Sequence, residues 1–385
     1  MAGEETSAAA LQAAGEVARN ESRHQVALER FHEQRVLTGA YSGGEVTALQ
    51  FLDHYDQAQA LLDRAGSIEA LLPSVQCAQM WHDFNLGRLA EADAGAAALL
   101  ELGRQLGTPV YLLDAVTTRG AVALLRGDAE TAQAQLAAAD SAVDNPGIAV
   151  MRGWLAAARG DLPAALDVLR PVLAGADALA GFWPLWPCWM SLIFDIGAAA
   201  GDRKFAINAV EAAETAAARN PGVASFEGVA LQLRGALDGD LDLLARAVAV
   251  LAASPRPVLR GGGALAYGKA LLAAGRQADA LAQLDRAWDE YDLMGARANR
   301  AQVQRLMRAA GARRAKWAVA AGGWSDLTEA ERRVADLIGA GNTNKAVASE
   351  LGVSINTVGT HLRSVFAKLG VQSRVQLANV LHARR

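Results

Sequence analysis

Small and aliphatic side chains recur at helical spacing in this sequence, as in Ala132, Leu136 and Ala139, and no stretch alternates Val or Ile with polar residues. Offsets of four and seven place such side chains on one face of an α-helix, whereas alternation would indicate a strand. Aromatic residues make up only 5% of the 385 residues. The pattern predicts an all-α protein that is long enough for two or three domains.

One arrangement of glycine, alanine and aliphatic residues returns along the chain at constant offsets. Its clear copies are Gly120, Gly127, Ala132, Leu136 and Ala139, then Gly153, Gly160, Ala165, Leu169 and Val172, and then Gly268, Gly275, Ala280, Leu284 and Ala287. Weaker copies contain Gly87, Gly201 and Gly239, and a first copy contains Ala58, Leu62 and Ala65. Successive turn glycines, from Gly87 to Gly275, stand 33 to 41 residues apart.

Each copy predicts a helical hairpin. Its first glycine lets two antiparallel helices approach closely, and its second ends the first helix in a left-handed conformation. The pattern resembles a degenerate tetratricopeptide repeat, and such hairpins bury their apolar faces by stacking into a solenoid with a concave surface. We therefore expect an N-terminal helical segment over residues 1–40 and a repeat domain over 41–311 that binds a protein or small-molecule effector.

Capping signals divide the last sixty residues into four short helices. These signals are Thr328 with Glu331, Thr343 or Asn344, Ser354, and Ser373 with Gln376. In the third of these helices, Val358, Leu362 and Leu369 recur at helical spacing and predict its buried face. Gly352, between the second and third helices, predicts a tight turn.

Four motifs follow one another in this region, at residues 327–331, 344–348, 357–362 and 368–374. Their order and spacing resemble the DNA-binding module of LuxR-type transcription regulators. The resemblance implies a four-helix variant of the helix-turn-helix over residues 325–385, after a linker at 312–324, with its third helix in the major groove of double-stranded DNA.

The resemblance also assigns roles to single residues. It implies that Gly359, Thr360 and Arg363 reach base edges, where Arg363 would bond guanine O6 and N7. The residues placed for phosphate contacts are Lys345, Ser354, Thr357, His361, Lys368 and Arg374. Gly359 departs from the family, which usually carries a longer polar residue there, so this chain lacks one DNA donor.

The charge distribution agrees with such a module. The formal net charge is −4, but Glu350 is the only acidic residue from Gly339 onward, against six Lys and Arg. This local positive charge is typical of a modular DNA-binding protein. Cys77 and Cys188 stand alone, so we expect a reducing cytoplasm, no metal site and no cofactor.

A second resemblance covers residues 260–311, which are similar to the end of the helical region in large ATP-binding, MalT-like regulators of the LuxR family. We expect the ATPase half of those proteins to be absent here. Residues 263–270 approach the spelling of a phosphate-binding loop, but Ala270 lacks the hydroxyl that Mg²⁺ requires and no strand precedes Gly263. We therefore expect a packed helix, with a nucleotide-dependent switch as the alternative.

An aromatic cluster interrupts the repeats between residues 182 and 194. It contains Phe182, Trp183, Trp186, Trp189 and Phe194. Trp183, Trp186 and Trp189 could line an effector pocket, or the cluster could fill the core where two repeats meet. The sequence leaves both interpretations open.

These features predict a bacterial, cytoplasmic transcription regulator that is not an enzyme and does not enter a membrane. The fourth C-terminal helix carries Val375, Val380 and Leu381, which could form a homodimer contact or belong to the core of the domain. The competing hypothesis is a tetratricopeptide-like interaction scaffold with a weak or vestigial DNA-binding domain.

Overall fold

The computed structural model of the chain is helical throughout the part that it describes. It describes residues 7–40, 42–64, 72–106, 109–138, 145–176, 180, 184–312, 327–369, 371, 374, 377 and 381, and these residues contain no strand. The predicted all-α class is therefore confirmed. The chain divides into two compact units, Met1–Ala310 and Gly311–Arg385, and each is described by itself.

The helices of the first unit have the following bounds: α1 (Ala8–Asn20), α2 (His24–Thr38), α3 (Gly43–Phe51), α4 (Tyr55–Arg64), α5 (Pro73–Asn85), α6 (Leu89–Leu106), α7 (Pro109–Arg126), α8 (Ala129–Ala138), α9 (Pro146–Ala158), α10 (Leu162–Ala174), α12 (Trp186–Ala199), α13 (Arg203–Arg219), α14 (Ala224–Asp238), α15 (Leu241–Leu251), α16 (Pro257–Ala273), α17 (Gln277–Met294) and α18 (Arg297–Ala309). The second unit contains α19 (Glu329–Gly339), α20 (Asn344–Leu351) and α21 (Ile355–Leu369).

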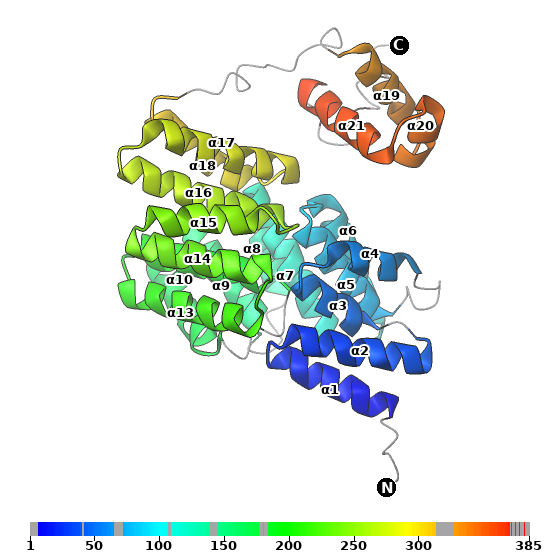
Figure 1. The fold of residues 1–385 in the computed structure, drawn as a ribbon, viewed down its shortest axis with the longest axis horizontal. Coiled ribbons are helices and arrows are strands. Elements are labelled where there is room, and N and C mark those ends of the chain that lie inside the picture. Colours follow the sequence, from blue (N-terminus) through cyan, green and yellow to red (C-terminus); the bar gives the residue numbers. More distant parts are fainter. Residues whose placement is uncertain are drawn as a thin grey trace. The chain divides into compact units, whose positions relative to one another are not determined.

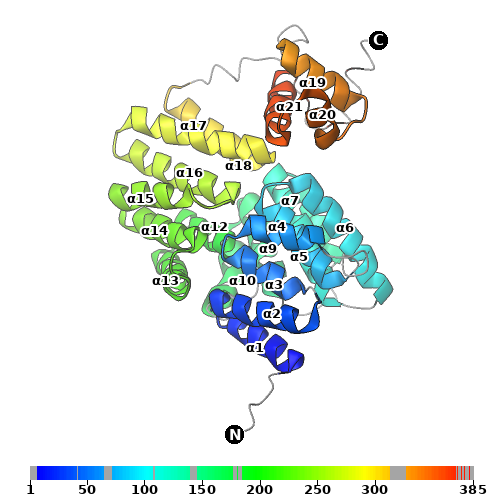
Figure 2. The same cartoon turned by 45° about the vertical axis from the view of Figure 1, so that its right-hand side comes forward.

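Consecutive helices of the first unit pack as hairpins, and the hairpins pack on their neighbours in chain order. Figures 1 and 2 show this most clearly for α13 to α18. The first helices of successive hairpins, from α3 through α5, α7, α9, α12 and α14 to α16, contact one another as well. The unit is therefore a stack of helical hairpins whose first helices form one continuous layer.

The turn glycines of the repeat adopt the conformation that the sequence predicts. They have φ values between +70° and +85° and are Gly87, Gly127, Gly160, Gly201, Gly239 and Gly275. Close approach is also confirmed, because a Cβ on Gly153 would lie 2.6 Å from Leu169 and one on Gly268 would lie 2.9 Å from Leu284. Both leucines are fully buried, so the small residue on one helix receives the large residue on the other.

Residues 263–270, which approach the spelling of a phosphate-binding loop, lie inside α16. Gly263 packs against Leu251, to which a Cβ at this position would come within 2.6 Å. A phosphate-binding loop needs backbone N–H groups that are free to bind phosphate, and those of a helix interior are bonded within the helix. The packed-helix interpretation is therefore confirmed for this segment.

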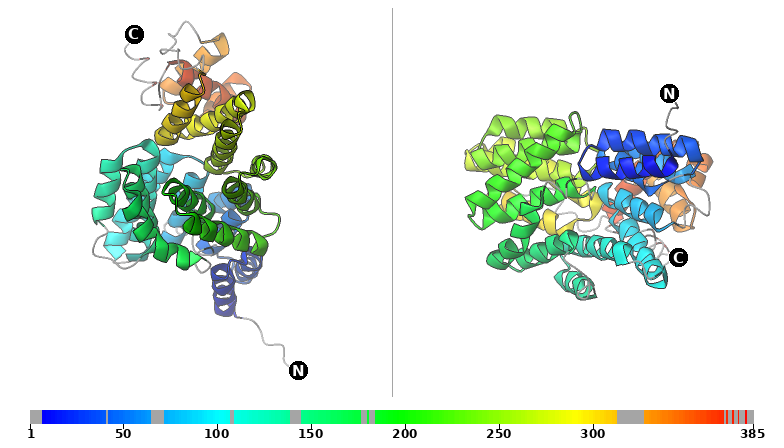
Figure 3. Two further views of the ribbon diagram at one scale, coloured as in Figure 1. Left: turned by 90° about the vertical axis from the view of Figure 1, so that its left-hand side faces the viewer. Right: turned by 90° about the horizontal axis from the view of Figure 1, so that it is seen from below.

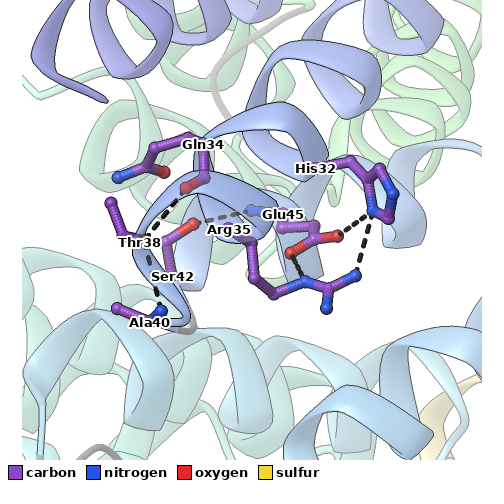
Figure 4. Close-up of polar contacts among 7 residues, drawn as sticks. All are labelled: His32, Gln34, Arg35, Thr38, Ala40, Ser42 and Glu45. Atoms are coloured by element: carbon purple, nitrogen blue, oxygen red, sulfur yellow. Dashed lines mark hydrogen bonds and ion pairs between the residues drawn. The ribbon is translucent and has the colours of Figure 1, made fainter. Parts of the chain in front are cut away.

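The N-terminal hairpin α1–α2 is joined to α3 by a compact polar corner (Figure 4). The buried carboxylate of Glu45 accepts a hydrogen bond from Arg35 Nε at 2.6 Å and lies 3.3 Å from His32 Nδ1. Ser42 caps α3 by accepting from the backbone N–H of Glu45. These contacts fix the N-terminal helices to the first repeat, so residues 8–38 belong to the same compact unit.

The stack of hairpins curves back on itself. Helix α18 contacts α7, and a Cβ on Gly87, in the α5–α6 turn, would lie within 2.8 Å of Met294 and Pro257 side-chain atoms. Seen from below in Figure 3, the N-terminal helices (blue) lie beside the green helices. The first and last hairpins of the unit therefore cover surfaces that an open solenoid would leave exposed.

Arg256 holds this closed arrangement together. Its side chain is fully buried and pairs with Asp53 at 3.0 Å. It also donates hydrogen bonds to the backbone carbonyls of Pro184 at 2.5 Å and Gln50 at 2.7 Å. One guanidinium thus joins its own segment to acceptors from two others, residues 50–53 and Pro184, that are far away in the chain. The fixed fork of arginine donors allows this.

His24 lies at the same seam between distant segments. Its ring stacks on Phe51 with a centroid distance of 3.8 Å and faces Phe226 at 5.7 Å. Its backbone N–H donates to Asn220 Oδ1. Burial of the ring, together with the positive charges of Arg19 and Arg256, lowers the pKa of His24 to about 3. The imidazole is therefore neutral at physiological pH.

The second unit has a small core of its own. Its central residues come from α19, α20 and α21 and include Val334, Ile338, Val347, Val358 and Val365. The capping box predicted at Thr328 and Glu331 is present. Thr343 caps α20, and Gly352 ends it with a φ of +66°. In the described part of the chain, no helix combines the length and apolar character needed to cross a membrane.

Replacing the central arginine by an apolar residue of similar length tests the role given to it. We expect Arg256→Met to lower the stability of the full chain by roughly 3–5 kcal/mol, because it removes the counterion of the largely buried Asp53 carboxylate and leaves it only the backbone N–H of Ser225 as a donor. The measurement is urea unfolding followed by far-UV circular dichroism. Arg246→Met, at an exposed position on α15, is the matched control, and an equal loss in both variants would contradict the role of Arg256.

The depressed pKa of His24 predicts acid sensitivity. Below pH 6.5 the unfolded chain gains a proton on this histidine, whereas the folded chain does not until about pH 3. The contribution of His24 to the free energy of unfolding is therefore complete above pH 6.5 and falls at lower pH by about 1.4 kcal/mol per pH unit. We expect His24→Phe, which keeps the stacked ring, to lose about 2 kcal/mol less than the wild type between pH 6.5 and 5. Identical urea unfolding profiles across this pH range would refute the assignment.

Candidate nucleic-acid interface

Helices α20 and α21 form the helix-turn-helix, and local interactions set their angle. The left-handed Gly352 ends α20, and Val353 donates its backbone N–H to the carbonyl of Ala348 at 3.0 Å. Ser354 then begins α21 by accepting a hydrogen bond from the backbone N–H of Thr357 at 3.0 Å. The turn is therefore only three residues long, as the sequence predicts.

The packing of α21 decides which of its faces remains available. Val358 and Val365 are fully buried, and Leu362 is 8% exposed, all within the core of the second unit. Phe366 and Leu369 pack at the edge of that core. The opposite face of the helix is therefore the one that can contact a ligand.

That opposite face carries the three residues predicted to reach base edges. Thr360 and Arg363 are exposed, and Arg363 Nη2 donates to Thr360 Oγ1 at 3.0 Å. The remaining N–H groups of this guanidinium have no acceptor among the described residues. A Cβ on Gly359 would meet no atom within 4 Å. The fold therefore does not require glycine at this position, and the reading face is open there.

Arg363 and Thr360 have the chemistry that base recognition needs. A guanidinium can donate two hydrogen bonds to the O6 and N7 acceptors of guanine, and a threonine offers both a hydroxyl and a methyl group. The hydrogen bond between the two side chains holds the guanidinium along the exposed face of α21. Because arginine has five N–H donors, this bond leaves others free for a base.

The residues predicted to contact phosphates fall into two groups. Lys345, in the first turn of α20, is exposed and makes no ion pair or hydrogen bond with any described residue. The hydroxyls of Ser354 and Thr357 lie 2.8 Å apart at the start of α21, where Ser354 also caps the helix. His361 is half-buried. Of these four residues, Lys345 offers the most available positive charge.

Lys368 and Arg374, the other two predicted phosphate contacts, are engaged within the domain. Arg374 donates to the carbonyl of Asn342 at 3.1 Å and also hydrogen-bonds Asn344 Oδ1, which ties it to the turn between α19 and α20. Lys368 Nζ pairs with Glu331 at 2.7 Å. A phosphate would have to compete with these partners for either side chain.

Glu331 has a second role that the sequence did not indicate. Besides its capping box, its buried carboxylate accepts from Lys368 Nζ at 2.7 Å and from Ser364 Oγ at 2.5 Å. Burial raises the pKa of Glu331, but the hydrogen bonds from Lys368, Ser364 and Thr328 outweigh it and lower the pKa to about 2. The network fixes α21 to the start of α19. The spacing of four between Ser364 and Lys368 is the signal that could have revealed a shared partner.

The proposed dimer residues are only partly within the described region. Leu381 packs on the core of the second unit, and a Cβ on Gly339 would lie 2.2 Å from its side chain. This contact favours the core interpretation for Leu381. Val375 and Val380 lie outside the described residues.

The tryptophans predicted to line an effector pocket are separated by the structure. Trp189 lines a cavity in the first unit, together with Phe194. Trp186 is buried with only 1% of its surface exposed and is not part of the cavity lining. Phe182 and Trp183 lie outside the described residues. Trp186 therefore belongs to the core and Trp189 to the lining of a cavity. The effector pocket stays a prediction.

The chain has a distant match among solved structures. One match is the crystal structure of the TPR domain of P58(IPK), at 14% identity, covering 80% of this chain and 91% of that chain with a TM-score of 0.21. A score at this level does not establish a shared fold. The repeat architecture therefore rests on the hairpins and turn glycines described above.

The second unit has clear relatives. A putative HTH-type transcriptional regulator of Mycobacterium tuberculosis is 53% identical over 57 residues, which are 15% of this chain and 6% of the relative. The monoamine regulon transcriptional regulator of Klebsiella aerogenes is 42% identical over 53 residues, 14% of this chain and 23% of the relative. The transcriptional regulatory protein UhpA of Escherichia coli is 42% identical over 60 residues, 16% of this chain and 31% of the relative.

This chain thus spans less than a third of the length of each of these relatives. Residues 325–381 match the family of bacterial regulatory proteins named GerE, the luxR family. The match, the two helices joined at Gly352 and the exposed face of α21 agree with one another. The C-terminal part of this chain is therefore a helix-turn-helix domain of the LuxR family.

Proposed function

We propose that this protein is a bacterial transcription regulator that binds double-stranded DNA through α21. The observation that carries the proposal is the exposed Thr360–Arg363 pair, which lies opposite the buried stripe of a LuxR-family recognition helix. In this proposal α21 lies in the major groove and Arg363 contacts guanine. Lys345 and the hydroxyls of Ser354 and Thr357 contact the phosphate backbone.

The different roles that we propose for the basic side chains follow from the contacts that each side chain already makes. Arg363 has guanidinium N–H groups to spare and would give base preference, whereas Lys345 would give affinity that does not depend on sequence. Lys368 and Arg374 hold α21 and the α19–α20 turn in place. They would reach phosphates only by giving up the acceptors they already have, so we assign them a positioning role first.

The first unit is the regulatory part in this proposal. Its closed stack of hairpins offers an inner surface to an effector, and its size relative to the DNA-binding unit suits a sensing role. In this proposal the protein meets its DNA ligand in the bacterial cytoplasm. The alternative function is an interaction scaffold. Gly359 favours it, because a recognition helix without a polar side chain at this position offers DNA one contact fewer.

A salt titration of DNA binding by the full chain separates these two functions. We expect binding to duplex fragments selected from genomic DNA, with an affinity that falls steeply as salt concentration rises, because bound cations displace counterions from phosphates. Fluorescence anisotropy with a labelled duplex is the measurement. Failure to bind any duplex at low salt would support the scaffold.

Removal of the reading arginine should affect sequence preference. We expect Arg363→Ala to weaken binding to the selected duplex by roughly 1–3 kcal/mol while leaving binding to a scrambled duplex almost unchanged. Lys345→Ala is the matched control, because it should weaken binding to both duplexes equally and reduce the salt slope by about 1. An equal loss on both duplexes for Arg363→Ala would show that this side chain does not read bases.

Substitution of Gly359 tests whether the reading face is open. Since a Cβ there meets no atom within 4 Å, we expect Gly359→Ala to stabilise the second unit by about 0.5–1 kcal/mol through helix propensity alone. Gly359→Lys should fold equally well and bind duplex DNA several-fold more tightly than Gly359→Ala. Thermal unfolding and anisotropy measure the two effects, and equal DNA affinity of both variants would place residue 359 outside the interface.

A further inference from the structure

The first unit contains a partly open cavity of about 550 Å³ among its inner helices. Its lining comes from α5, α7, α9, α12, α14 and α16, which are first helices of successive hairpins, and from α17 and α18 at the end of the stack. The cavity exists because the stack curves back and brings these faces toward one another. Its volume lies within the range of about 300–1,000 Å³ that is usual for small-molecule sites.

Aromatic side chains form much of the apolar wall of this cavity. They come from four different helices and are Phe84, Trp154, Trp189, Phe194 and Tyr291. Such walls suit a flat or bulky apolar body, because aromatic pairs add attraction to the burial of apolar surface. The lining alone would accept many apolar molecules, so polar groups have to select among them.

Two opposite charges line the same cavity. Asp195 on α12 and Lys269 on α16 both line it, and neither makes an ion pair or hydrogen bond with any described residue. Asp195 is exposed inside the cavity, but the surrounding protein restricts its hydration and raises the pKa of its carboxyl, while Lys269 lowers it. Charges in such a site are costly unless a ligand or water satisfies them.

A third polar side chain of the cavity lining has an acceptor atom with no donor among the described residues. Gln232 is 4% exposed, and its Oε1 has no hydrogen-bond donor among the described residues. A Cβ on Gly262 would lie 4.0 Å from the amide atoms of Gln232 and from the hydroxyl oxygen of Tyr291. Gly262 therefore leaves open space between an amide and a phenol. An unpaired buried carbonyl is unfavourable, and a hydrogen bond from a ligand N–H would relieve that cost.

We propose that this cavity binds a small zwitterion with an aromatic or bulky apolar body, the class to which aromatic amino acids belong. Lys269 pairs with the ligand's carboxylate, Asp195 pairs with its ammonium group, and Gln232 accepts one of its N–H groups. The aromatic walls cover the body. An uncharged ligand would leave both charges unpaired, and a ligand with a single charge would leave one.

Only the regulatory role of this site rests on the proposed function, because binding of the zwitterion would then be the signal that the first unit senses. Binding is measured without DNA. A negative result here would leave the DNA-binding proposal standing, and failure of DNA binding would leave this test intact.

The test is calorimetric titration of the full chain with L-phenylalanine, phenethylamine and 3-phenylpropionate, which share one body and differ in charge. We expect L-phenylalanine to bind at least about tenfold more tightly than either singly charged probe, a difference of about 1.4 kcal/mol. Asp195→Asn should weaken L-phenylalanine and phenethylamine but not 3-phenylpropionate. Lys269→Met should weaken L-phenylalanine and 3-phenylpropionate but not phenethylamine.

Matched controls keep the result interpretable. Asp167→Asn and Lys204→Met make the same changes at exposed positions of α10 and α13 outside the cavity, and they should leave binding unchanged. Gly262→Leu fills the open space without a close contact at its Cβ and should abolish binding of all three probes while thermal unfolding stays near that of the wild type. No binding of L-phenylalanine at millimolar concentration, or binding that neither charge variant alters, would overturn the proposal.

Discussion

A single buried guanidinium closes the first unit. Arg256 binds Asp53 and the backbone carbonyls of Gln50 and Pro184, so segments from the start, middle and end of the stack meet at one side chain. Each hairpin can bury only one face by itself, and an open stack would leave its ends exposed. Because a buried cation is tolerated only when its donors are satisfied, the acceptors specify this one arrangement. The enclosed inner surface, with its cavity, follows from it.

The second unit depends on a comparable buried charged side chain, within a much smaller core. Glu331 caps α19 and also binds Ser364 and Lys368, which fixes the rotation of α21 about its axis. That rotation decides which residues are buried and which face a ligand. Arg363 is exposed because Val358 and Val365 are turned inward, so the reading surface is a consequence of how the core packs.

Part of the site could be predicted from sequence because its signals are local. The capping box at Thr328, the turn at Gly352 and the apolar spacing along α21 all act within four or five residues. The pairing of Lys368 with Glu331 joins residues 37 apart, and the spacing of four between Ser364 and Lys368 does not identify the partner that they share. For this reason sequence reasoning expected a phosphate contact at a side chain that the fold engages elsewhere. Its DNA role remains a prediction.

The sequence by itself determined the helices, their order and the hairpin turns, because propensity, caps and left-handed glycines act between near neighbours. It also indicated which residues α21 turns outward, since the apolar periodicity marks the opposite face as the one that packs inward. Only the tertiary structure decided that the stack closes at Arg256 and that Asp195 and Lys269 share one cavity. Those juxtapositions depend on the accumulated curvature of successive hairpins, which no single segment of the sequence encodes.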